Sequence, residues 1–174
     1  MREPSIVPTT VERFFAEDEI IVSKTDLKGH ITYANETFLK IADYTEEEVL
    51  GKAHSIIRHP DMPRCVFKLL WDTIADRSEI FAYVKNMAKN GDYYWVLAHV
   101  TPTFDESGRI IGYHSNRRVP ERGQVELFTN IYAQLLREEK RHPDWRSGME
   151  AAGKMLVDMI AAKRMLYEEF VFSV

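Results

Sequence analysis

The sequence predicts an α+β fold in which a five-stranded antiparallel sheet carries helices on one face and is followed by C-terminal helices. Up to Pro120, strand-like and helix-like patterns follow one another in the order strand, strand, three helices, three strands. After Pro120 the pattern changes to long amphipathic helical stripes. We therefore expect an N-terminal extension over residues 1–18, a sheet domain over 19–119 and a helical output or dimerisation segment over 120–174.

The first two strands are predicted at residues 19–23 and 30–33, because an Asp-Leu-Lys-Gly turn signal separates two β-rich runs. A short helix is expected over 36–42. A capping box at 45–48 then marks the start of the next helix, because a Thr hydroxyl and a Glu three residues later satisfy exposed helix amides.

The rest of the domain is predicted as one longer helix and three strands. Apolar residues at helical spacing indicate a helix over 62–75. Strands are expected over 80–87, 93–104 and 109–116, joined by segments rich in Asn, Asp and Gly that suit tight turns.

The segment after Pro120 carries two apolar stripes at helical spacing. The pattern leaves two interpretations open, a helical bundle within the chain and a dimer seam. The stripes consist of Leu127, Phe128, Ile131, Tyr132, Leu135 and Leu136, and of Met155, Leu156, Met159, Ile160, Leu166 and Tyr167.

Composition excludes several classes of protein. A formal net charge of −4 disfavours a nucleic-acid surface, and a single cysteine, Cys65, excludes an internal disulfide and a cysteine-based zinc site. No leader-like apolar run begins the chain, and no run reaches the roughly 18 apolar residues of a membrane span. We expect a cytoplasmic protein without direct membrane insertion. No catalytic motif is evident, so we expect neither an enzyme nor a metal site.

The run Arg58-His59-Pro60-Asp61 places a cation, an imidazole and a carboxylate together before a predicted helix. A structural interpretation competes with a functional one, because Asp61 is a good helix cap with Pro63 in the first turn. The same tetrapeptide recurs at 141–144, where we expect it only to end one helix and begin another. The tetrapeptide alone is therefore weak evidence for a ligand site.

Four other polar or aromatic residues are candidates for a site. Asn35 stands at the start of a predicted helix, so it suits a cap, a ligand contact or both. Asn86 lies within a strand, where Asn is disfavoured, which favours a functional role for its side chain. Trp71 and Trp95 are expected in the core or in a pocket wall.

Together these motifs resemble a PAS domain, and most closely the FAD-binding PAS sensor of bacterial aerotaxis receptors. The resemblance covers about residues 19–119. It rests on Thr25-Asp26, Tyr33-Ala34-Asn35-Glu36-Thr37-Phe38, Glu48-Val49-Leu50-Gly51-Lys52, Arg58-His59-Pro60-Asp61-Met62-Pro63, Val84-Lys85-Asn86 and Lys89-Asn90-Gly91-Asp92-Tyr93-Tyr94-Trp95-Val96.

The resemblance implies a redox sensor that holds FAD noncovalently between sheet and helices. By the family pattern, Asn35 and Asn86 bind the ring edge or neighbouring groups, and Arg58 suits a pyrophosphate. Asp61 either binds the cofactor or orients its neighbours. The complete set of predicted cofactor-binding residues is Asn35, Arg58, His59, Asp61, Trp71, Asn86 and Trp95.

One position departs from the family pattern. Such sensors often carry a Trp early in the strand that contains Asn86, and this chain has Ile80 there, followed by Phe81. Phe81 would compensate only in a shifted register, because strand side chains alternate faces. A cofactor-free PAS dimerisation or scaffold module is therefore one alternative. A haem-binding PAS gas sensor is another, with ligand candidates His54, His99 and His114.

The resemblance also suggests partners. Receptors of this family usually contain a membrane anchor and a signalling rod, and this sequence shows neither. We expect a homodimer that reports to a separate, membrane-bound signalling protein of chemotaxis type. The C-terminal helices would provide the docking surface.

Overall fold

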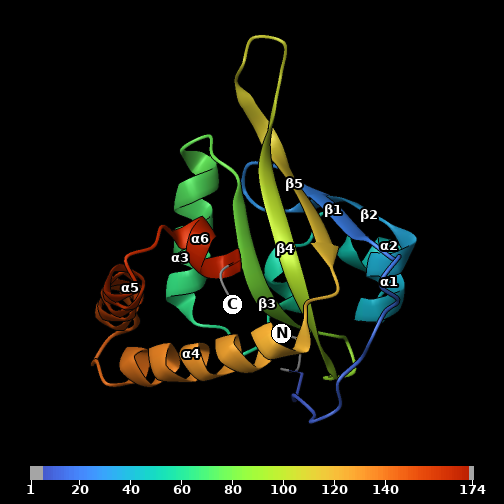
Figure 1. The fold of residues 1–174 in the computed structure, drawn as a ribbon. Helices are drawn as coiled ribbons and strands as arrows, with labels where there is room; N and C mark the ends of the chain where they lie inside the picture. The colour runs from blue at the N-terminus through green and yellow to red at the C-terminus, as the bar shows by residue number, and fades with distance from the viewer. Residues whose placement is uncertain (1–5, 173–174) are drawn as a thin grey trace.

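The computed structural model describes residues 6–172, so residues 1–5 of the predicted extension and 173–174 of the predicted helical segment lie outside the described residues. The order of elements in this part is two strands, four helical segments of which one is a 3-10 helix, three strands and three C-terminal helices (Figure 1).

The five strands form one antiparallel sheet, as predicted, in the order β2-β1-β5-β4-β3. The last strand lies in the middle of the sheet, so β5 joins the N-terminal hairpin to the long β3–β4 hairpin. The strands are β1 (Ile21–Thr25), β2 (Ile31–Ala34), β3 (Ile80–Met87), β4 (Tyr93–Phe104) and β5 (Ile110–Arg118).

The helices between β2 and β3 cover one face of the sheet, which we call the inner face. Its core includes Phe38, Val49, Ile74 and Val96, all nearly or fully buried. The segments are α1 (Glu36–Ala42), α2 (Glu46–Val49), a 3-10 helix η1 (His54–Ile57) and α3 (Arg64–Ala75).

The predicted bounds of the long helix, the first strand and the last strand were wrong by two residues at one or both ends. The long helix begins at Arg64, because Met62 is buried at the sheet, where its sulfur accepts a hydrogen bond from the Lys85 amide at 3.3 Å. The first strand begins at Ile21 and continues to Thr25, because the turn starts only at Asp26, whose carboxylate accepts from the Lys28 and His30 amides.

Two of the three C-terminal helices, the first and the last, lie against β3 on the opposite, outer face of the sheet, and the middle one packs on the first and on α3. Tyr132 is 4% exposed, stacks on Trp95 and donates its hydroxyl to the Tyr83 carbonyl at 2.6 Å. Phe172 packs edge-on against Phe81. The helices are α4 (Arg122–Lys140), α5 (Trp145–Ala162) and α6 (Tyr167–Phe172) (Figure 1).

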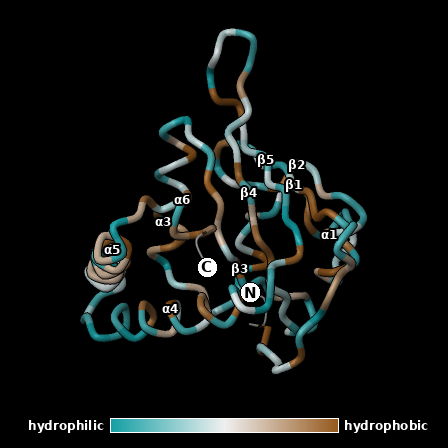
Figure 2. The backbone as a smooth tube through the Cα atoms, in the orientation of Figure 1, coloured by the Kyte–Doolittle hydropathy of each residue, from teal (hydrophilic) through white to brown (hydrophobic). Residues whose placement is uncertain are grey.

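This packing assigns the first of the two apolar stripes to the chain's own core, whereas Leu166 of the second stripe is 68% exposed. The stripe of α4 is buried against the chain's own sheet, with Phe128, Ile131 and Leu135 each less than 9% exposed. The turn that joins α4 and α5 is hydrophilic (Figure 2). The stripe of α4 is therefore part of the intramolecular core.

The described part of the N-terminal extension runs beside β4 and is tied to α4. The Arg13 amide donates to the Tyr93 carbonyl at 2.7 Å, and the Tyr93 amide donates to the Val11 carbonyl. Arg122 at the start of α4 binds Glu12 through two hydrogen bonds, of 2.6 and 3.0 Å. The extension and the C-terminal helices thus meet at one end of the sheet.

The Tyr132 hydroxyl provides a test of the docking of α4. Tyr132→Phe keeps the ring but leaves the buried Tyr83 carbonyl without this donor, so we expect the free energy of unfolding to fall by about 1–3 kcal/mol. Urea unfolding measures the difference. Tyr33→Phe is the matched control, because Tyr33 is 44% exposed; equal effects of the two changes would contradict the docking described.

Candidate functional site

A cavity of about 340 Å³ lies between the inner face of the sheet and the helices η1 and α3. Its volume falls within the range of small-molecule sites. Apolar side chains form most of its wall, which gives a slot suited to a flat hydrophobic group. These side chains include Ile57, Phe67, Leu70, Ile74, Val84, Ala98 and Val100.

The mouth of the cavity lies between α3 and the β1–β2 turn. Trp71 lines it, is 38% exposed and packs edge-on against Tyr113, with ring centroids 5.4 Å apart. Gly29 faces Trp71 so closely that a Cβ at this position would lie 3.0 Å from the indole. Gly29 also has φ +78°, so the turn and the close approach both require glycine. Trp71, one of the predicted cofactor-binding residues, therefore lies at the mouth of the cavity.

The deep end of the cavity is polar. Arg117 on β5 donates to the Ser23 hydroxyl at 2.8 Å and to His54 Nε2 at 2.7 Å. Ser23 Oγ also lies 3.0 Å from His54 Nε2, so the hydroxyl can donate to the imidazole. Because His54 Nε2 accepts from a guanidinium, the neutral tautomer of His54 with its proton on Nδ1 fits this arrangement.

Several buried polar atoms of the cavity residues have no hydrogen-bond partner within residues 6–172. They are Thr25 Oγ1, Asn86 Nδ2, Ser115 Oγ and Arg117 Nη1. Within the same residues, the side-chain hydrogen-bond partners of Arg117 are the uncharged Ser23 and His54, although Arg117 is only 4% exposed. A buried cation and buried donors without partners are costly in free energy, so their grouping in one cavity indicates a site for a polar ligand edge.

The two titratable groups at the deep end have perturbed pKa values. Burial, and secondarily the charge of Arg117, lower the pKa of His54 from 6.5 to about 3. Burial lowers the pKa of Arg117 from 12.5 to about 10, so Arg117 remains a cation at neutral pH. The cavity therefore combines a neutral imidazole with a fixed positive charge.

Arg58 and Asn86, two of the predicted site residues, both line this cavity. An antiparallel bridge joins their backbones, so the start of the Arg-His-Pro-Asp run lies beside the C-terminal end of β3. The Arg58 guanidinium lies over the Phe67 ring at 4.6 Å and donates to the Met62 carbonyl at 3.2 Å. Burial, and then the neighbouring Arg64, lower the pKa of Arg58.

Asn35 has a structural role and is not among the residues that line the cavity. Its side-chain oxygen accepts from the Val22 and Phe38 amides at 2.9 and 3.0 Å, and its amide group donates to the Ile20 carbonyl at 2.8 Å. Asn35 thus caps α1 and fastens it to β1. The geometry supports the cap and gives no contact to a ligand.

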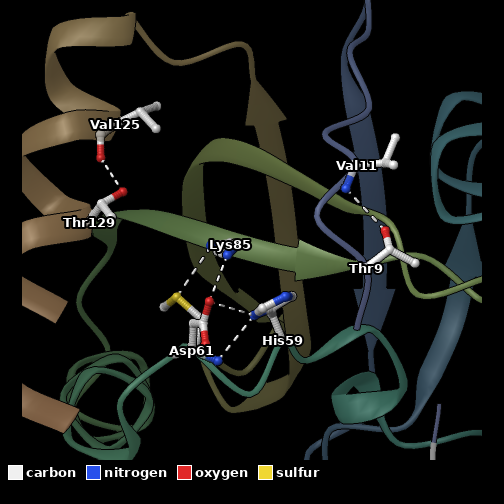
Figure 3. Close-up of polar contacts among 8 residues, drawn as sticks. Thr9, Val11, His59, Asp61, Lys85, Val125 and Thr129 are labelled. Atoms are coloured by element: carbon white, nitrogen blue, oxygen red, sulfur yellow. Dashed lines mark hydrogen bonds and ion pairs between the residues drawn. The ribbon is translucent and has the colours of Figure 1, made fainter. Parts of the chain in front are cut away.

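His59 and Asp61 also lie away from the cavity, next to residues of the outer face (Figure 3). Asp61 pairs with Lys85 at 2.7 Å, and its backbone amide donates to His59 Nδ1 at 3.0 Å. The buried His59 ring packs edge-on against Tyr93. Asp61 does not cap α3, whose N-cap is Pro63, so that part of the prediction was wrong because Lys85 holds the carboxylate elsewhere.

Trp95 is on the outer face, where it stacks against Tyr132 of α4. Strand alternation explains this position, because Tyr94 and Val96 occupy the inner face. The prediction that Trp95 lines the pocket was therefore wrong, and only its alternative role in the core remains.

The same alternation settles the position of Ile80. Ile80 pairs with Val100 on the inner face, without a register shift in the β3–β4 pair. Phe81 points to the outer face, where it stacks on His99 at 4.2 Å. Phe81 therefore does not replace the ring that is missing at Ile80.

The second copy of the tetrapeptide behaves as expected. Asp144 caps α5, accepting from the Arg146 and Ser147 amides at 3.0 Å each, and Arg141 ends α4. The two copies thus differ in two ways. Asp144 caps a helix whereas Asp61 pairs with Lys85. Arg141 ends α4 whereas Arg58 lines the cavity.

Sequence reasoning missed the deep end of the cavity. Arg117, Ser23 and Ser115 were not predicted, and His54 was considered only as a haem ligand. The signal that was available is the alternation of polar residues in β5, where Ser115 and Arg117 share the inner face with Tyr113. A charged residue on a buried strand face is the kind of exception that marks a site.

Within residues 6–172, no three His, Cys, Asp or Glu side chains converge to hold a metal ion. Of the three haem-ligand candidates, His99 is on the outer face and His54 Nε2 faces a guanidinium. A cation beside the ligand nitrogen opposes coordination of iron.

The sequence is similar to known sensor proteins. A model of the PAS fold matches residues 31–117, half of the chain. The aerotaxis receptor of Escherichia coli (strain K12) is 44% identical over 120 residues, which are 69% of this chain and 24% of the receptor. The chain thus matches about a quarter of the length of that relative.

The fold is similar to that of solved light-sensing domains. The dark structure of the blue-light photoreceptor Aureochrome1 LOV superimposes with a TM-score of 0.56 at 24% identity, covering 63% of this chain and 82% of that one. A Light-Oxygen-Voltage domain studied with a flavin analogue superimposes with a TM-score of 0.55 at 19% identity, covering 71% and 87%. These likenesses confirm the fold. Separately, no helix within residues 6–172 is long and apolar enough to cross a membrane.

The neutral state of His54 predicts a dependence of stability on pH. The unfolded chain protonates His54 below about pH 6.5, whereas the folded chain does so only near pH 3. Because the unfolded state binds more protons in this window, the free energy of unfolding falls as the pH falls, by up to about 1.4 kcal/mol per pH unit from this residue. Urea unfolding between pH 6.5 and 5 measures the slope.

His54→Asn removes this titration, so its slope in that window should be shallower than that of the wild type. His142→Asn, at the end of α4 and away from the cavity, is the control. Equal slopes in the wild type and His54→Asn would refute the neutral buried imidazole.

Asn35→Ala separates the cap from a ligand contact. Loss of three hydrogen bonds should lower the free energy of unfolding by about 2 kcal/mol or more. At a temperature where the variant is folded, its affinity for a cavity ligand should equal that of the wild type. Weaker binding by fully folded Asn35→Ala, measured by fluorescence titration, would restore the ligand role.

Proposed function

This chain belongs to the PAS family, and we propose that it is a redox or energy sensor whose cavity holds a flavin, specifically noncovalent FAD. The likeness to an aerotaxis receptor and to a domain studied with a flavin analogue supports this proposal. We propose a sensor and not an enzyme.

The observation that carries the proposal is the buried Arg117, whose side-chain hydrogen-bond partners among the described residues are both uncharged. Its guanidinium keeps its positive charge, is 4% exposed, and leaves Nη1 without a partner among the described residues. A ligand edge rich in electron density would stabilise this cation, because charge–dipole interactions are strong in a buried site. The carbonyl-bearing edge of a flavin ring has this chemistry.

The rest of the cavity fits the same ring. The wall formed by Leu70, Ile74 and Val84 suits an apolar tricyclic plate, and Trp71 adds an aromatic surface at the mouth. At the polar end, Asn86 Nδ2 and Ser115 Oγ are available to bind ring heteroatoms. These residues fit a flavin without the Trp that is absent at Ile80.

The cavity rim fits phosphate groups. Lys28, Ser55 and Arg58 all line the cavity. The planar guanidinium of Arg58 suits bidentate binding of a phosphate, and the Lys28 ammonium supplies a second positive charge. This arrangement supports a cofactor with a phosphate-bearing tail, for which FAD is our candidate.

When bound, a flavin supplies a redox couple whose reduced ring carries more electron density than the oxidised ring. Arg117 would favour the electron-rich form because its charge is fixed beside that edge. Asn86 would adjust its hydrogen bond, and β3 carries this change across the sheet, since Tyr83 and Lys85 of the same strand face α4 and Asp61. The sheet would thus pass a signal to the C-terminal helices.

The proposed setting is a cytoplasmic homodimer that acts on a membrane-bound signalling protein of chemotaxis type. The similarity to the aerotaxis receptor supports this class of partner. Differential binding of the partner to the oxidised and reduced states would produce the signal.

Absorption spectroscopy of the purified full chain tests the proposal. Flavin bands in the blue region, with FAD released on denaturation, are the expected result. A Soret band would show that the bound cofactor is haem and would contradict the flavin proposal. A colourless protein that binds no added FAD would exclude the sensor proposed here and leave the cofactor-free scaffold.

A pair of variants on opposite faces of the sheet tests the site. Asn86→Ala should weaken FAD binding by about tenfold, because one buried hydrogen bond is lost, without changing the oligomeric state. Trp95→Phe is the matched control, because Trp95 packs on α4 across the sheet, and its FAD affinity should equal that of the wild type. Fluorescence titration and sedimentation measure the two properties; equal FAD affinity in both variants would contradict this assignment.

A further inference from the structure

Three helices meet at the start of α3. The Cys65 amide, in the first turn of α3, donates to Glu139 Oε1 near the end of α4 at 2.9 Å, across 74 residues of sequence. Helix α3 has no cap of its own, because its N-cap is Pro63 and no side chain there accepts a bond. A carboxylate also interacts favourably with a helix N-terminus. Glu139 therefore replaces the missing cap from another helix.

Helix α5 holds Glu139 in place. A Cβ at Gly148 would lie 2.2 Å from the Glu139 carbonyl oxygen and 3.1 Å from its Cα, so α5 packs directly on the α4 backbone. A Cβ at Gly153 would lie 3.8 Å from Cys65 Cβ, which places α5 against α3 as well. Helices α3, α4 and α5 therefore contact one another at one place, which we call the junction.

Helix α3 is also a wall of the cavity. Phe67, Leu70, Trp71 and Ile74 all line the cavity from this helix. Cys65 is only two positions before Phe67, so a shift of the first turn moves the wall. The junction therefore connects the cavity with helices that lie beyond the PAS match, which ends at residue 117.

We propose that Glu139 is a positioning residue that latches the C-terminal helices to the cavity wall, so that ligand binding in the cavity and docking of α5 stabilise each other. The inference rests on the proposed function only for the identity of the ligand. By linkage, if docked α5 favours the bound ligand, the bound ligand must favour docked α5 to the same degree.

Hydrogen exchange of the full chain tests the latch with three variants. Glu139→Ala removes the acceptor, and Glu139→Gln restores a side-chain oxygen. Glu138→Ala is the matched control, because Glu138 pairs with Arg141 and His142 and makes no contact with α3. Exchange in the first turn of α3 and in α5 should become about tenfold faster in Glu139→Ala. It should return toward the wild-type rate in Glu139→Gln and be unchanged in Glu138→Ala.

Added FAD supplies the second readout. In the wild type, FAD should slow exchange in α5, and this effect should be lost in Glu139→Ala, whose FAD dissociation constant should rise about fivefold. Circular dichroism controls for folding of each variant. Glu139→Ala that matches Glu138→Ala in both exchange and affinity overturns the latch. Faster exchange in α3 with unchanged FAD affinity overturns the coupling.

The two proposals fail in different ways. If the wild type binds no FAD, the proposed function fails, and exchange alone then decides the latch: faster exchange of α5 in Glu139→Ala than in Glu138→Ala supports it, and equal exchange overturns it. Gly148→Ala gives an independent check, because its Cβ meets the Glu139 backbone and should loosen α5 with Glu139 intact. Unchanged exchange of α5 in Gly148→Ala also counts against the junction.

Discussion

The hydrogen bonds of the buried Arg117 guanidinium hold the polar end of the cavity together. Arg117 reaches Ser23 and His54 and lies over the Phe38 ring at 5.6 Å, so it joins β5, β1 and η1 at one point. None of these neighbours is an anion, and His54 is kept neutral by the same burial. Among the described residues, no anion contacts this buried positive charge. Burying a charge without an anionic partner costs free energy, so the same residue affects both the stability of the fold and the chemistry of the site.

The sheet separates the cavity from helices α4 and α6. Strand alternation sends Asn86 into the cavity and its neighbour Lys85 to the outer face, where it pairs with Asp61. Helix α4 packs on that outer face through Tyr132, and its far end returns to the cavity wall through Glu139. Two separate physical routes, one through β3 and one around the end of α3, therefore connect the cavity with the C-terminal helices. Such a route can transmit a signal only if the ligand-bound and ligand-free states of the cavity favour the docking of α4 or α5 to different degrees.

The fold was predictable because its signals are local. The turn at Asp26, the capping box at Thr45 and the periodicity of β3 and β4 each specify an element within a few residues, and the elements were found in the predicted order. The site was predicted only in part: Arg58, Trp71 and Asn86 line the cavity, and Asn35, His59, Asp61 and Trp95 do not. The tetrapeptide misled because its members diverge in space, with Arg58 turned to the inner side and Asp61 held by Lys85.

By itself, the sequence determined the α+β class, the PAS pattern, the amphipathic faces and the helix-capping role of the second tetrapeptide, because short-range sterics and hydrogen bonds decide these features. Only the tertiary structure decided which polar residues share the cavity, that α4 packs on its own sheet, and that Glu139 caps α3. These outcomes depend on strand register and on contacts between residues far apart in the chain, such as Cys65 with Glu139 and Ser23 with Arg117. A shift of one residue in register would send Arg117 to the other face, and no local pattern records that choice.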